Sequence, residues 1–100
     1  MTQAALPGLL ARERALLLLE QTYGFWLAKA REIAMQVCRE HGSVTSDDVL
    51  ERLELPEGAS HNVIGAIFAN GAGGRFRASG YVPTRRPQGH GRRIVKWVRR

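Results

Sequence analysis

The sequence contains a single cysteine, few aromatic residues and no long apolar run. Cys38 has no second cysteine to pair with, so an internal disulfide is excluded and nothing indicates an oxidising compartment. Leu16–Leu19 is a run of only four apolar residues in a charged segment, far short of the roughly 20 that span a bilayer. Residues 1–10 lack the basic segment of a signal peptide. These absences predict a cytoplasmic protein with no membrane association.

Acidic residues are absent from the last 26 positions, Arg75–Arg100, which hold nine of the 15 Lys and Arg residues. The other 74 positions carry six basic and nine acidic side chains, so the formal net charge of +6 divides into −3 followed by +9. Such segregated charge is typical of a surface that binds a polyanion. A chain of 100 residues with 44% apolar residues is sufficient for one small domain with one core.

The N-terminal part of the chain shows the periodicity of a long helix. Apolar residues recur in alternating steps of three and four at Leu16, Leu19, Tyr23, Trp26, Ala30, Ile33 and Val37. We expect a helix over residues 9–41, ended by Gly42, because glycine accepts the left-handed conformation that follows a helix. Gly24 lies off the stripe and is a candidate for a bend or for a division into two helices.

Two shorter helices are predicted in the middle of the chain. After an extended piece near Val44, residues 45–48 supply capping oxygens and first-turn carboxylates for a helix over 47–53. Ser60 is placed to cap a third helix over 61–70, with Ile64, Ile67 and Phe68 on its apolar side and polar residues on the other. Residues 71–74 then end this helix.

Alternating apolar residues after position 75 predict a β-hairpin, with Phe76, Tyr81 and Val82 before the turn and residues 94–98 after it. The long tip spans residues 83–91. The resulting order is helix, short strand, helix, turn, helix, strand, loop, strand. We therefore predict a mainly α fold with a small β-hairpin (α+β), a winged helix-turn-helix preceded by a long N-terminal helix.

The helix pair and the hairpin predict a nucleic-acid interface. In a helix-turn-helix, the second helix presents small or polar side chains to the major groove, here the helix at 61–70. The hairpin, about 81–98, concentrates arginines at its tip, where a wing contacts phosphates or the minor groove. Two amphipathic helices alone are common core elements, and a charged hairpin alone can serve solubility; their combination favours DNA. The predicted DNA-binding residues are Ser60, His61, Asn62, Gly65, Asn70, Arg75, Arg77, Thr84, Arg85, Arg86, Gln88, His90, Arg92 and Arg93.

Three stretches of this sequence resemble small winged-helix proteins of bacteriophage and prophage genomes. These are Gly42–Val49, Asn62–Phe68 and Gly80–Pro87, the last together with His90, Arg92 and Trp97. The resemblance covers roughly residues 26–98. It implies a winged-helix fold and a DNA-associated role, with no particular pathway or target sequence.

Other groups of residues offer no chemistry beyond binding. Asp47, Asp48 and Glu51 are explained as cap and dipole partners at a helix start, not as metal ligands of a nuclease. Cys38 and His41 form an incomplete zinc set, so a buried thiol is the better interpretation. Trp97 is expected in the core, whereas Tyr81 is a candidate to stack on single-stranded bases. We expect no metal, no cofactor and no enzymatic activity.

The N-terminal helix has more leucines than one stripe needs. Leu9, Leu10, Leu17 and Leu18 add a second apolar face. This face predicts either a homodimer through the N-terminal helix, which would suit paired half-sites, or a fold-back of residues 6–10 over it. We divide the chain into an N-terminal helical extension at 1–24, a candidate dimerisation element, and a winged helix-turn-helix domain at 25–100.

The sequence thus predicts a double-stranded DNA-binding protein of phage or prophage type, a transcriptional regulator or an accessory factor of replication or recombination. Two alternatives remain open. One is a protein-interaction module, a phage-encoded inhibitor or adaptor whose leucine-rich helix docks on a host protein. The other is a binder of RNA or single-stranded DNA.

Overall fold

The computed structural model describes residues 7–100, with side chains for residues 11–87 and 89–100. The long helix α1 (Pro7–His41) is followed by the short helices α2 (Ser46–Leu50) and α3 (Asn62–Ala66). A turn labelled α4 (Asn70–Gly74) then leads into the hairpin strands β1 (Phe76–Pro83) and β2 (Arg93–Arg99), with one 3-10 turn at the tip. This mixture of helices and a small antiparallel sheet confirms the predicted α+β class.

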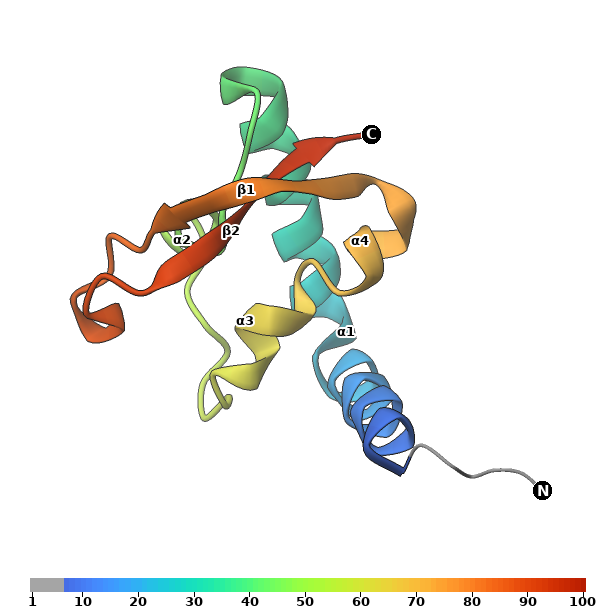
Figure 1. Ribbon diagram of the computed structural model, residues 1–100. Helices are drawn as coiled ribbons and strands as arrows, with labels where there is room; N and C mark the ends of the chain where they lie inside the picture. The colour runs from blue at the N-terminus through green and yellow to red at the C-terminus, as the bar shows by residue number, and fades with distance from the viewer. Residues whose placement is uncertain (1–6) are drawn as a thin grey trace.

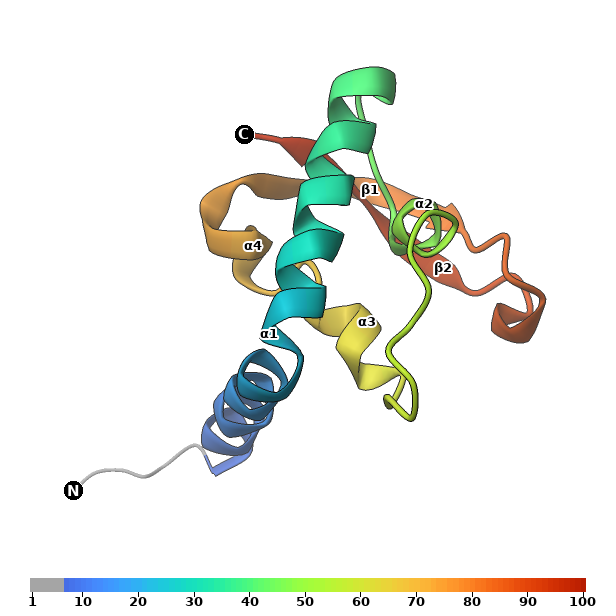
Figure 2. The ribbon, with the colours of Figure 1, turned by 180° about the vertical axis from the view of Figure 1, so that it is seen from behind.

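The second half of α1 lies against one face of the hairpin, with α2 on the same side and α3 near the hairpin tip (Figure 1 and Figure 2). The core between these elements is small and apolar. Its largest fully buried side chains come from α1, α2, α3, β1 and the segments beside them: Leu27, Val44, Val49, Val63, Ile67 and Phe76. Trp97, which the sequence places in the core, is partly buried and packs against it, stacked on Phe68 with ring centroids 5.1 Å apart.

Helix α1 is bent. Tyr23 departs from helical geometry, with φ −119° and ψ 27°, one residue before the glycine that the sequence marked as a candidate bend. Beyond the bend the buried face is centred on Leu27, Ala30 and Ala34, and Ile33 of the expected stripe is only partly buried. Before the bend, the helix extends away from the body of the protein (Figure 1). We call this part, Pro7–Thr22, the arm.

The middle helices are shorter than expected. Helix α2 ends at Leu50 instead of residue 53, and α3 ends at Ala66 instead of residue 70. The capping prediction for α2 is confirmed, because Thr45 and Asp48 form a reciprocal capping box. The Ser60 hydroxyl accepts a hydrogen bond from the Asn62 N–H at 3.1 Å, but the N-cap of α3 is His61, which makes no side-chain capping bond.

The early end of α3 has a conformational cause. Ala69 is extended, with ψ 133°, and from Asn70 to Gly74 every residue has a positive φ. The α4 turn is therefore a left-handed turn, which needs glycine at most positions because a Cβ is disfavoured there. Asn70 begins this turn and therefore does not lie on the helix predicted for residues 61–70.

The end of α3 is held by an arginine from α1. Arg31 Nε donates to the carbonyl of Ile67 at 2.9 Å, and Arg31 Nη2 donates to the carbonyl of Ala66 at 2.7 Å. The same guanidinium pairs with Glu20 of the arm. Arg31 therefore satisfies helix-end carbonyls that lack an intrahelical partner and links both halves of α1 to α3.

We expect Arg31→Met to lower the free energy of unfolding by about 2 kcal/mol, because hydrogen bonds to a charged group contribute roughly 1.5–3 kcal/mol each and partial exposure of the site reduces the loss. The methionine keeps the aliphatic stem, so the packing changes little. The matched control is Lys29→Met, an exposed position on the same helix, with an expected change below about 0.5 kcal/mol. Equal urea midpoints for the two variants would contradict this role.

The sheet has three antiparallel segments in space, although only β1 and β2 form strands. Val44 pairs with Trp97 of β2 through two backbone hydrogen bonds of 2.9 Å, so the predicted extended piece lies beside β2, opposite β1. The register between β1 and β2 shifts between Ala78 and Gly80. Within residues 7–100, no helix is both long and apolar enough to cross a membrane.

Candidate nucleic-acid interface

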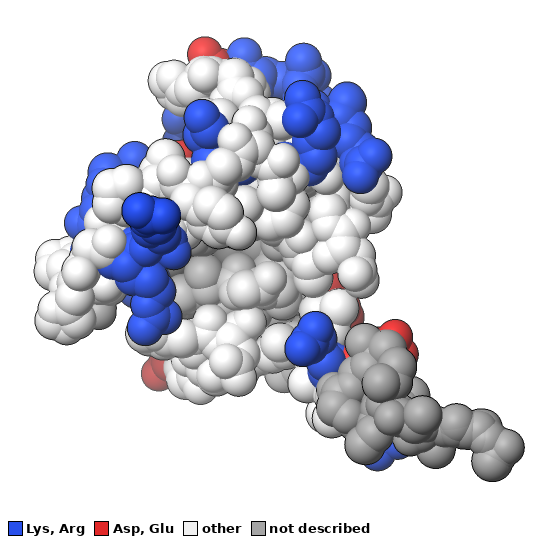
Figure 3. Space-filling view, viewed as in Figure 1, with Lys and Arg blue, Asp and Glu red and all other residues white. Residues whose placement is uncertain are grey.

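The basic residues of the final quarter gather in two groups, separated by the length of the hairpin, with Lys96 between them. The antiparallel register places Phe76 opposite Arg99 at the base and Pro83 opposite Arg93 at the tip. A strand of this length spans about 26 Å. Basic side chains accordingly gather at the hairpin tip and near the C-terminus in Figure 3. The base group contains Arg75, Arg77, Arg99 and Arg100, and the tip group contains Arg85, Arg86, Arg92 and Arg93.

Most of this positive charge is not neutralised within the described part of the chain. Of the nine basic residues at 75–100, only Arg85 makes an ion pair with another residue that the structure describes. The side chains of Arg92 and Arg93 are exposed, and that of Arg86 is half-buried. The tip thus keeps three guanidinium groups available for an anionic ligand.

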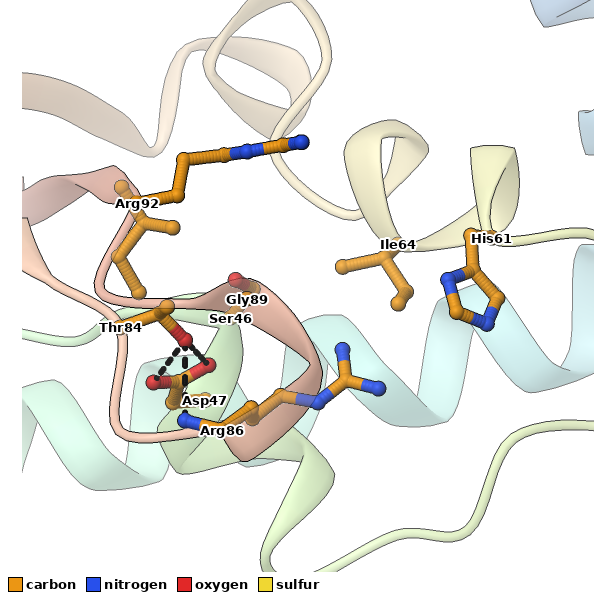
Figure 4. A pocket seen from close by; sticks show the side chains of 9 residues that line it. Ser46, Asp47, His61, Ile64, Thr84, Arg86, Gly89 and Arg92 are labelled. Atoms are coloured by element: carbon orange, nitrogen blue, oxygen red, sulfur yellow. Dashed lines mark hydrogen bonds between the residues drawn. The ribbon is translucent and has the colours of Figure 1, made fainter.

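A cleft of about 290 Å³ lies between the hairpin tip and the start of α3. Arg86 and Arg92 line it from the tip, and His61 and Ile64 line it from α3. In Figure 4, both arginine side chains extend from the tip toward the α3 side, and Arg86 reaches toward His61. The structure therefore brings together polar and basic side chains from two segments that are far apart in the sequence.

The tip is anchored to α2 by Asp47, which is only 4% exposed. The Thr84 hydroxyl lies 2.9 and 3.0 Å from the two carboxylate oxygens of Asp47, and the Arg85 N–H donates to Asp47 Oδ2 at 2.7 Å. From the sequence, Asp47 is predicted to act only at the start of its helix. No sequence signal identified its partners, because they lie 37 and 38 residues away.

Arg85 forms a second connection between the tip and α2. Its Nη2 atom donates to Asp48 Oδ1 and to Glu51 Oε2, both at 2.8 Å. Burial opposes ionisation of Asp48, but hydrogen bonds from Arg85 and Thr45 outweigh it and hold the pKa of Asp48 below its ordinary value. Hydrogen bonds to the two carboxylates also raise the pKa of Arg85. Arg85 therefore belongs to the attachment of the hairpin tip to α2, in addition to its predicted contact with DNA.

The other predicted residues are distributed around α3 and the tip. Asn62 and Gly65 lie with Asn70 in a second hollow, between α3 and the arm, where Arg12 also lies. His90 is exposed at the tip with φ 51°. The side chain of Gln88 lies outside the described residues. Arg75 and Arg77 do not join the tip cleft, since the register places them at the hairpin base.

The remaining candidate groups show no binding geometry. Cys38 is 3% exposed, as predicted, and burial raises the pKa of its thiol, which favours the inert protonated form. Across the described residues, no three His, Cys, Asp or Glu side chains lie together as metal ligands would.

Comparison with known proteins finds no matching family model, no matching curated protein and no matching solved structure.

Proposed function

We propose that the chain is a winged helix-turn-helix protein that binds double-stranded DNA. The observation that carries the proposal is the cleft in which Arg86 and Arg92 of the tip face His61 at the start of α3. A helix-turn-helix uses its second helix in the major groove while a neighbouring element contacts the phosphates. Helix α3, which is short and has a polar exposed face, supplies the groove helix. Arg86 and Arg92, which form no ion pair among the described residues, supply the phosphate contacts.

Three features of the fold support the winged-helix interpretation. Helix α3 follows α2 and a turn, as the second helix of a helix-turn-helix does. The pairing of Val44 with β2 provides the third sheet segment beside the hairpin. The tip is fixed to α2 through Asp47, so the arginines are presented by a rigid element instead of a free loop.

The exposed face of α3 is limited to a few small or polar side chains. His61, Asn62 and Gly65 are exposed, whereas Val63 and Ala66 are buried in the core. Asn62 is the candidate for a base contact, because an amide side chain can both donate to and accept from adenine. Gly65 leaves the backbone of α3 open on the side that faces the arm.

We expect Arg86→Ala combined with Arg92→Ala to weaken binding to a duplex and to reduce the salt dependence. Each neutralised phosphate contributes about −0.9 to the log–log slope of affinity against salt, so loss of two contacts lowers the slope magnitude by about 1.8. Fluorescence anisotropy of a labelled random-sequence duplex over a salt series measures both quantities. We expect affinity at physiological salt to fall by at least about tenfold, which corresponds to about 1.4 kcal/mol.

The matched control is Lys29→Ala combined with Arg39→Ala, which removes the same charge from α1. Both side chains are exposed, and neither lines the cleft. The net charge of this variant equals that of the Arg86/Arg92 variant, so we expect a slope change well below one if the cleft is the binding surface. Unchanged affinity and slope in the Arg86/Arg92 variant would contradict the proposed docking surface.

A competition among duplex DNA, single-stranded DNA and RNA separates the main proposal from its nearest alternative. Tyr81 is 68% exposed on β1 and adjoins the basic tip, an arrangement that also suits base stacking. Preferential displacement by single strands would favour that alternative. Selection of bound sequences from a random duplex pool would then identify any specific site and show whether it is palindromic.

A further inference from the structure

Helix α1 has an apolar surface that no described residue covers. Phe25, two residues after the bend, is 97% exposed, and Leu17 and Leu18 of the arm are 57% and 58% exposed. A phenylalanine can bury roughly 150–250 Å² in a contact, so an exposed Phe25 together with two exposed leucines leaves a large apolar area of α1 without cover among the described residues. Residues 7–10, for which a fold-back was one expectation, instead continue the helix.

Six exposed residues on both sides of the bend at Tyr23 follow a helix-pairing spacing in the sequence. Successive steps of four, three, four, three and four connect Arg14, Leu18, Gln21, Phe25, Ala28 and Glu32, and all six are exposed. Alternating steps of three and four are typical of a seam between two helices. We call this row the α1 seam. Its middle contains Leu18, Phe25 and Ala28 with the polar Gln21 among them, and its ends carry opposite charges.

The charges at the two ends identify the partner that fits the α1 seam. Neither Arg14 nor Glu32 makes an ion pair within the part of the chain that the structure describes. Parallel pairing of two copies would place each charge against its equal. Antiparallel pairing about a two-fold axis at residue 23 places Arg14 opposite Glu32 of the second copy, at both ends of the seam.

The same register matches the side chains in the middle. Leu18 faces the small Ala28 of the second copy, and Phe25 faces Gln21. The row therefore has a mainly apolar middle, interrupted by Gln21, between charged ends, a composition that suits a protein interface. We propose that two copies of this chain associate through antiparallel pairing of their α1 seams, with the two-fold axis beside the bend at Tyr23. This inference is independent of DNA binding.

The first test measures molar mass in solution without DNA, by sedimentation equilibrium over a range of concentrations. We expect a dimer that dissociates on dilution, and a monomer for Phe25→Glu, because a carboxylate would be buried at the centre of the interface. Phe25 is nearly fully exposed within one copy, so its replacement leaves the fold intact, as circular dichroism would verify. The control is Tyr81→Glu, an exposed aromatic residue outside α1, which should remain dimeric.

The second test establishes the register by charge reversal. Arg14→Glu and Glu32→Arg should each weaken the dimer by about tenfold, since each turns two attractive pairs into two repulsive ones. The double variant exchanges both signs and should recover the original affinity. A monomeric wild-type chain at every concentration would overturn the proposal. A dimer that is indifferent to these reversals, or a double variant that fails to recover, would overturn it equally.

Discussion

Replacing Gly71 with alanine is expected to lower the free energy of unfolding by about 3 kcal/mol, the sum of a backbone clash and an unfavourable φ. A Cβ at position 71 would lie 2.6 Å from the carbonyl oxygen of Phe76, closer than real contacts allow. Gly71 also has φ +64°, where a side chain costs about 1–2 kcal/mol. Because the opposing atom belongs to the backbone, no side-chain rotation relieves the clash.

The clash would be transmitted to the core. Phe76 is 1% exposed, and its ring packs edge-on against Phe68 with centroids 5.3 Å apart. A displaced Phe76 carbonyl would move the first residue of β1 and the aromatic contact with it. Core packing tolerates such shifts poorly, since interiors are close to crystal density.

Gly73→Ala provides the matched control for this prediction. Gly73 lies in the same left-handed turn with φ +76°, and no heavy atom lies within 4 Å of its virtual Cβ. It shares the conformational penalty but not the clash, so we expect a loss of only about 1–2 kcal/mol. Urea denaturation of both variants measures the difference. Equal losses would show that the approach to Phe76 does not restrict position 71.

Replacing Asp47 with alanine is expected to lower the free energy of unfolding by about 2 kcal/mol and to release the hairpin tip from α2. The carboxylate is 4% exposed and accepts hydrogen bonds from the Thr84 hydroxyl and the Arg85 N–H. Its loss leaves both donors without their partner. Water replaces part of the interaction because the tip itself is partly exposed, which keeps the expected loss moderate.

Two measurements separate release of the tip from general instability. Hydrogen exchange should show faster exchange of the Arg85 N–H in the variant, whereas the N–H groups that pair Val44 with Trp97 remain protected. DNA affinity should fall as well, because the tip arginines lose their fixed position. Unchanged exchange at Arg85 would contradict the anchoring role.

Glu51→Ala is the control for removal of a carboxylate near the tip. Glu51 also bonds Arg85, but its side chain is 62% exposed and Asp48 still holds the guanidinium. Exposed ion pairs contribute about 0–1 kcal/mol, so we expect a change below about 0.5 kcal/mol. Asp47 and Glu51 both bind the hairpin tip, but only Asp47 is buried. The difference in unfolding free energy between the two variants therefore measures how much burial strengthens such a contact.

Local patterns in the sequence predicted the elements that depend on neighbouring residues. The apolar spacing located α1, Thr45 and Asp48 marked the start of α2, and alternation located the hairpin. These features follow from short-range geometry, namely helical periodicity, capping and the alternation of side chains in a strand. The glycines at 71–74 indicated a helix end, but the exact ends were less predictable, because the contacts of Arg31 with the carbonyls after α3 depend on a distant segment.

The candidate site was predicted only in part, for the same reason. His61, Arg86 and Arg92 converge in one cleft, whereas Arg75 and Arg77 lie at the other end of the hairpin. Counting charges in the sequence cannot separate these arginines, because it does not show which residues of the two strands lie opposite each other.

By itself, the sequence determined the α+β class, the positions of the main helices and strands, and the separation of positive charge into the final quarter. Only the tertiary structure decided which arginines remain available, because Asp47 fixes the tip while Asp48 and Glu51 occupy Arg85 from a distant part of the chain. Periodicity and capping act between residues a few positions apart, whereas hydrogen bonds between distant segments exist only after the chain has folded.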